Sequence, residues 1–82
     1  MATFVESLID GYEDQGFGHK IDETTIASYN NDTEVSFDAE YDGDDVSTLD
    51  VYSNGTHLET FDVRDDNFVD RLSTLMSSEL DF

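Results

Sequence analysis

The chain contains no cysteine, which excludes disulfide bonds and metal sites built on thiolates and leaves its redox compartment open. No stretch approaches the roughly 18 consecutive apolar residues that a membrane-spanning helix needs. The N-terminus has neither the positive start nor the apolar run of a signal peptide. We therefore expect a cytoplasmic protein with no membrane partner.

Basic residues are scarce. Lys20, Arg64 and Arg71 stand against 21 acidic residues, and the net charge is −18. A small domain needs a net charge of magnitude only about 2 to 8 for solubility, so the excess needs a separate cause. Between Ile21 and Val63 there are 12 acidic residues and no Lys or Arg. Salt bridges within that interval cannot neutralise it.

The length and the hydrophobic content predict one folded domain over residues 1–82. Eighty-two residues can bury a single modest core. Hydrophobic residues make up 37% of the chain and recur periodically, which places it outside the disordered class despite its charge.

The first segment predicts a helix. Its apolar residues form one stripe, namely Phe4, Val5, Leu8, Ile9 and Tyr12. Thr3 and Glu6 have the spacing of a capping box at the start of this helix. Gly16 and Gly18 predict that the helix ends before them. Glu13 and Asp14 lie near the C-terminus of this helix, where the helix dipole disfavours negative charge, so they oppose local stability.

A second helix is predicted from about Asp66 to Glu79. Its apolar face comprises Phe68, Val69, Leu72, Leu75, Met76 and Leu80. Asp65 and Asp66 suit its N-terminus both as caps and because they complement the dipole.

The stretch from Glu34 to Asp45 alternates as a half-buried strand does, and a strand is predicted from about Thr33 to Tyr41. Val35, Phe37, Ala39 and Tyr41 point one way, and Glu34, Ser36, Asp38 and Glu40 point the other. We expect the aromatic side chains of Phe4, Tyr12, Phe37, Tyr41 and Phe68 in the core.

Asn54-Gly55 predicts a hairpin between strands at about 46–53 and 56–63, because both central residues of a type I′ turn need a positive φ. A two-residue loop would pair Val51 with Leu58 and place Asp50 opposite Glu59. It would leave Tyr52, His57 and Phe61 on the outer side with those acids. A bulge would change these pairings, and the register stays open.

Residues 19–29 are ambiguous, because they alternate weakly and yet Asp22 could cap a helical turn. We favour a short helix or an irregular crossing here. The expected fold is therefore α+β: a three-stranded antiparallel sheet with an N-terminal and a C-terminal helix packed on one face.

Catalysis and a specific metal site find little support. His19 and His57 have no sequence reason to meet a nucleophile, so we expect no enzyme and no cofactor. The cluster Asp42-Gly-Asp44-Asp45 offers oxygen ligands but lacks the EF-hand spacing. A calcium-binding module is kept as an alternative, although no metal is expected.

The acidic strand favours mimicry of nucleic acid. Carboxylates at i and i+2 on a strand stand about 6.8 Å apart, similar to the step between backbone phosphates. A protein that neutralises phosphates would gain the same counterion release from them. The candidate partner-binding residues are Glu34, Asp38, Glu40, Asp42, Asp44, Asp45 and Asp50. A small halophilic domain is the alternative, since high Asp, scarce Lys and frequent Ser and Thr suit a saline cytoplasm.

Through the acidic strand, the Asn54-Gly55 hairpin and the final amphipathic helix, the chain resembles small acidic phage-encoded DNA-mimic inhibitors. These include anti-CRISPR, anti-restriction and nucleoid-protein (HU) blocking proteins. The resemblance implies a stoichiometric inhibitor in the host cytoplasm that occupies the DNA site of a basic host protein and binds no nucleic acid itself. A monomer and a homodimer are both compatible with it.

Overall fold

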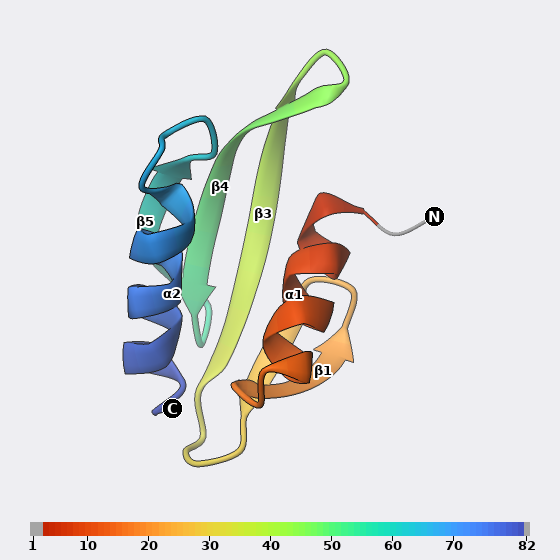
Figure 1. Ribbon diagram of the computed structural model, residues 1–82. Coiled ribbons are helices and arrows are strands. Elements are labelled where there is room, and N and C mark those ends of the chain that lie inside the picture. The colour runs from red at the N-terminus through yellow and green to blue at the C-terminus, as the bar shows by residue number, and fades with distance from the viewer. Residues whose placement is uncertain (1–2, 82) are drawn as a thin grey trace.

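The computed structural model describes residues 3–81, which form a five-stranded sheet with two helices. The elements in chain order are α1 (Phe4–Asp14), β1 (Gly18–Asp22), β2 (Thr25–Ser28), β3 (Glu34–Asp42), β4 (Asp45–Ser53), β5 (Thr56–Asp62) and α2 (Phe68–Glu79). All strands pair antiparallel in the order β1-β2-β3-β4-β5. Both helices cover one face (Figure 1), which we call the inner face; the opposite one is the outer face.

The predicted three-stranded sheet is wrong, because residues 18–28 form two further strands in place of a helix or a crossing. The Asp22 carboxylate accepts hydrogen bonds from the backbone N–H and the hydroxyl of Thr24, at 2.8 and 3.1 Å, so it closes a turn and does not cap a helix. The pairing of β1 with β2 shifts register between Lys20 and Asp22. This irregularity interrupts the alternation that would have revealed β1.

The first helix begins as predicted, and its acidic side has a structural function that the sequence did not reveal. Thr3 accepts a hydrogen bond from the Glu6 N–H at 3.1 Å. The Glu13 carboxylate accepts the backbone N–H of Lys20 at 2.7 Å, in the middle of edge strand β1. The Lys20 ammonium lies 2.9 Å from Glu6 and 3.4 Å from Asp10, and the Glu6 hydrogen bond is the main reason that the pKa of Lys20 is raised. These contacts attach α1 to the sheet.

The second helix begins two residues later than predicted, and residues at the end of β2 and in the β2–β3 loop cap its C-terminal end. Buried Ser28 donates its hydroxyl to the Leu80 carbonyl at 2.6 Å. The amides of Asn30 and Asn31 donate to the carbonyls of Asp81 and Glu79 at 2.8 and 3.2 Å. Side chains some fifty residues away thus satisfy carbonyls at the C-terminal end of α2 and just beyond it.

The Asn54-Gly55 hairpin is confirmed, and its register contains a bulge. Both residues have positive φ, 50° and 86°, in a two-residue loop. Pairing then shifts, so that Tyr52 faces His57 while Val51 faces Glu59, and Leu58 is the extra residue. From this point each side chain of β5 turns to the face opposite to the one that a regular ladder would give it.

The core lies between the inner face and the two helices. Its fully buried side chains include Ile9, Ile26, Leu49, Leu72 and Met76. The tip of the β3–β4 hairpin extends beyond both helices (Figure 1). Tyr41 lies near this tip and is 54% exposed, so its predicted place in the core is wrong.

The Asp22 turn predicts a pH-dependent stability difference. The Thr24 N–H is the main reason that the pKa of Asp22 is lowered from its usual 3.8. The carboxylate therefore adds stability above that pH, and the contribution disappears as the pH falls through the lower folded value. Asp22→Asn should lower the urea midpoint at about pH 7, and the difference from wild type should close as the pH falls below 3.8 and through the lower folded pKa.

Asp44→Asn is the matched control, because it removes the same charge from another exposed turn. It should show no such pH-dependent deficit. A deficit of Asp22→Asn that persists undiminished in acid would contradict an ionised Asp22 as its source.

Candidate partner-binding surface

A row of carboxylates runs along the outer face of β3. Val35 and Phe37 are buried on the inner face, so the alternating residues Glu34, Asp38, Glu40 and Asp42 project outward, as predicted. Asn54 fixes the start of the row, since its side-chain oxygen accepts the Glu34 N–H at 2.9 Å and its own N–H donates to the Glu34 carbonyl at 2.9 Å. The hairpin turn thus positions the first carboxylate of the acidic strand.

A second strand brings another carboxylate against this row. Asp38 and Asp50 are directly opposite partners in the β3–β4 ladder. Opposed Cβ atoms in such a pair lie about 4.5–5.5 Å apart, and like charges at this separation destabilise the sheet. The Asp50 side chain is only 17% exposed, so water screens it incompletely. The like-charge pair that the sequence suggested between Asp50 and Glu59 is therefore found between Asp50 and Asp38.

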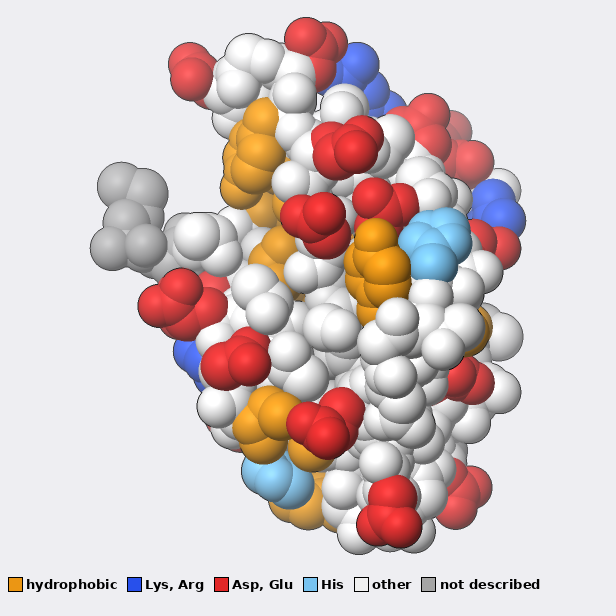
Figure 2. Space-filling model, turned by 180° about the vertical axis from the view of Figure 1, so that it is seen from behind, with side chains coloured by type: hydrophobic (Ala, Val, Ile, Leu, Met, Phe, Trp, Pro, Cys, Tyr) orange, Lys and Arg blue, Asp and Glu red, His pale blue; other side chains and the backbone are white. Residues whose placement is uncertain are grey.

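Hydroxyl groups surround the row where cations would be expected. Thr48 donates to Glu40 at 3.0 Å, and the Thr60 hydroxyl donates to Asp50. Figure 2 looks onto this face and shows acidic side chains separated by uncharged ones, with Lys and Arg side chains at its margins. Among the described residues, Asp42 is the only carboxylate of the row that lies within ion-pair distance of a Lys or Arg side chain; its partner is given below.

A set of Thr60, His57 and Asp50 on this face lacks the geometry of a catalytic triad. The same imidazole atom, Nε2, lies 3.3 Å from Asp50 Oδ1 and 3.0 Å from Thr60 Oγ1. In a triad, one ring nitrogen contacts the nucleophile and the other contacts the acid. Here the Thr60 hydroxyl donates to the Asp50 carboxylate, so hydroxyl and acid contact each other directly and are not linked through the two ring nitrogens.

The turn acids Asp42, Asp44 and Asp45 lie at the exposed tip of the β3–β4 hairpin. Asp42 and Asp45 are ladder partners, and Arg64 lies 3.5 Å from Asp42 with both side chains exposed. Within residues 3–81, no three acidic or histidine side chains gather closely enough to hold a metal ion. The three acids of the turn that prompted the calcium alternative do not form such a group in this structure.

The bulge at Leu58 changes which β5 residues share the outer face. Asp62 pairs with Thr48 and therefore lies on the outer face. In a hairpin without the bulge, Asp62 would point to the inner face. Phe61 is buried against α2, and Glu59 faces the helix side, where it lies 3.9 Å from Arg71. The suggested outward aromatic pair of Tyr52 and Phe61 is therefore wrong. Two consecutive turn residues predicted the hairpin, but no residue in β5 signalled its bulge.

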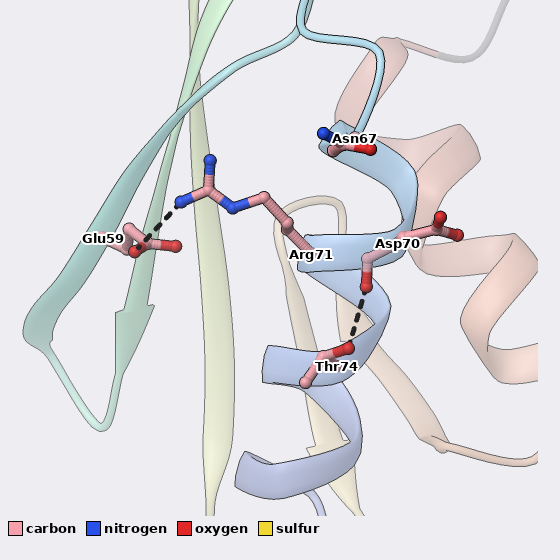
Figure 3. Close-up of a pocket in the computed structure, with 5 residues that line it drawn as sticks. All are labelled: Glu59, Asn67, Asp70, Arg71 and Thr74. Atoms are coloured by element: carbon pink, nitrogen blue, oxygen red, sulfur yellow. Dashed lines mark hydrogen bonds and ion pairs between the residues drawn. The ribbon is translucent and has the colours of Figure 1, made fainter.

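A hollow of about 420 Å³ lies between β5 and α2, lined by Glu59, Asn67, Asp70, Arg71 and Thr74 (Figure 3). The Arg71 guanidinium reaches from the helix toward Glu59, lies 3.9 Å from Asp65 and sits over the Phe61 ring at 5.8 Å. Thr74 donates to the Asp70 carbonyl within the helix at 3.0 Å. Two carboxylates already flank the Arg71 cation, so an anion in this hollow would also meet their negative charge.

No family model, curated protein or solved structure matches this chain. Over residues 3–81, neither helix has the length and the apolar character needed to cross a membrane.

Proposed function

We propose that this chain is a non-enzymatic inhibitor that presents its outer face to the basic DNA site of a host nucleic-acid-binding protein. The observation that carries the proposal is the row of Glu34, Asp38, Glu40 and Asp42 along β3, flanked by Asp50 and Asp62 on neighbouring strands. Lys20 and Arg71 are engaged with the helix side of the molecule. The face therefore offers carboxylates that a partner's Lys and Arg can neutralise.

The spacing of these carboxylates suits that role. Alternate residues of an antiparallel strand rise about 6.8 Å, and adjacent strands place parallel rows about 4.8 Å apart. Carboxylates accept bidentate hydrogen bonds from Arg, as phosphates do. A basic partner that neutralises these carboxylates would release the cations held near them, so its binding to this face would depend strongly on salt.

A second candidate, adaptation of a small domain to concentrated salt, is favoured by the acids on the remaining surface. Both helices and the loops around them also carry acids, among them Asp10, Asp14, Asp66, Asp70 and Glu79. Mimicry by the outer face does not explain these residues, and their spread counts against it. Acids spread over several sides of the surface would help the domain to keep its hydration shell in concentrated salt. In that case the domain would have another role.

Capture from a bacterial lysate tests the proposal. The immobilised chain should retain a DNA-binding protein at about 0.05 M salt and release it at about 0.5 M, because each neutralised carboxylate adds to the salt dependence. Duplex DNA added in excess should displace the captured protein, since both occupy one site. If excess duplex DNA does not displace the captured protein, mimicry is contradicted.

The same samples separate the two candidates. Circular dichroism at both salt concentrations should show a folded chain if the face serves a partner. A chain that folds only at molar salt and retains no DNA-binding protein would establish the second candidate and overturn the first.

A further inference from the structure

A groove without charged side chains runs between α1 and α2, on the side of the molecule away from the acidic row. Its walls include Leu8, Gly11 and Tyr12 from α1 and Val69 and Ser73 from α2, around a volume of about 170 Å³. Ser73 also lines an adjoining hollow of about 530 Å³, so the depression continues toward the end of α2. None of the described residues that line these two hollows is charged. In a chain with 21 acids, this is a marked interruption of the acidic surface.

Val69 shows that the groove has an unused apolar contact. Its side chain is 66% exposed, while its helix neighbours Phe68 and Leu72 are buried in the core. Across the groove, Leu8 is only partly buried against that core. Two apolar side chains from different helices therefore border one depression without filling it.

Gly11 gives a second and independent observation. It lies within the 11-residue helix α1, where glycine costs roughly 0.5–1 kcal/mol relative to alanine. A Cβ built on Gly11 would meet no atom within 4 Å, and Gly11 has no positive φ. Nothing in the described chain therefore requires glycine at this position. Glycine at this position does leave room for another backbone to approach α1 closely.

The charges beside the groove indicate what kind of partner could bind in it. Asp14 lies three residues from Gly11 on α1, and Asp70 lies three residues from Ser73 on α2, so each of these exposed carboxylates neighbours a groove-lining residue on its own helix. A second copy of this chain would bring its own acids against these rims and be repelled. A helix with a small or apolar stripe and basic flanks would match both the floor and the rims.

We propose that the groove between α1 and α2 is a docking site for a short amphipathic helix of a partner, with Ala and Leu along one stripe and Lys or Arg on both flanks. The 11 residues of α1 span about 16 Å, which matches about three turns of a docked helix. The site is separate from the outer face and does not depend on its function.

The probe is a fluorescently labelled 14-residue helical peptide with a Leu/Ala stripe and flanking Lys and Arg, titrated with the full chain at about 0.15 M salt. A second peptide keeps every Lys and Arg and carries Ser in place of Leu. The first peptide should bind at least about tenfold more tightly, because only it fills the apolar groove. Equal binding of the two peptides, or no binding of either, overturns the proposal.

Gly11→Leu should weaken binding of the first peptide by about tenfold or more, because the new side chain would occupy the space of the docked backbone. Gly11→Ala should weaken it less, and circular dichroism of both variants should show that α1 is intact. Unchanged affinity in Gly11→Leu with an intact helix would also overturn the proposal. The triple variant Asp38→Asn/Glu40→Gln/Asp50→Asn should bind the peptide within about twofold of wild type. Failure at the groove is therefore distinguishable from failure of the proposed function at the outer face.

Discussion

Neutralising Asp38→Asn, Glu40→Gln and Asp50→Asn together should reduce capture of the DNA-binding partner by about 100-fold or more at low salt. Each lost charge-assisted contact is worth about 1.5–3 kcal/mol, and 1.4 kcal/mol corresponds to a factor of ten in affinity. The slope of log affinity against log salt should also fall by about two to three, because fewer counterions are exchanged. Quantitative binding of the captured partner across a salt series measures both effects.

The matched control removes three exposed acids from the helix side, Asp14→Asn, Asp66→Asn and Asp70→Asn, and brings the chain to the same net charge. These substitutions should change capture by less than about threefold, since they lie away from the outer face. Equal losses from the two triple variants would show that net charge alone attracts the partner, and would contradict a defined face. Circular dichroism should show both variants folded, because none of the six side chains is buried in the core.

The second large effect is expected at Gly18, where β1 approaches β2 closely. A Cβ at this position would lie 2.2 Å from the carbonyl oxygen of Ala27 and 3.0 Å from its carbonyl carbon. Both are backbone atoms, so no side-chain rotation relieves the overlap. Gly18→Ala should cost about 1–3 kcal/mol or more, a large part of the roughly 4–12 kcal/mol expected for a domain of this size.

Gly11→Ala is the control for this substitution, because it adds the same methyl group where no atom lies within 4 Å. It should raise the free energy of unfolding by about 0.5–1 kcal/mol, since alanine restricts the unfolded chain and favours the helix. Urea unfolding followed by circular dichroism measures both variants. A Gly18→Ala protein as stable as wild type would show that β1 and β2 are not held this closely in solution.

Local signals in the sequence predicted the elements that depend on neighbouring residues. Thr3 and Glu6 marked the start of α1, and Asn54-Gly55 marked the hairpin because few residues other than these adopt positive φ. The alternation of Glu34–Asp42 placed the acidic row on the outer face correctly. Each of these features is encoded within about ten residues.

The parts that were missed depend on contacts between distant segments or on an irregular ladder. The β1–β2 hairpin needs the close approach of Gly18 to Ala27, which no periodic pattern announces. The Leu58 bulge reversed the faces of Glu59 and Phe61 because a one-residue shift inverts all later side chains. The cap on α2 joins Ser28 to Leu80, two residues whose proximity exists only after folding.

Glu13 has a consequence for how copies of this chain can associate. Its carboxylate accepts a hydrogen bond from the Lys20 N–H at the centre of β1. A strand that added to this edge would need that N–H for its own hydrogen bond. The β1 edge of the sheet is thus obstructed at its centre, whereas in the described part of the chain, residues 3–81, no side chain accepts a main-chain donor of β5. Growth of a fibril requires two usable edges on every copy, so edge-to-edge association here would end at a closed pair.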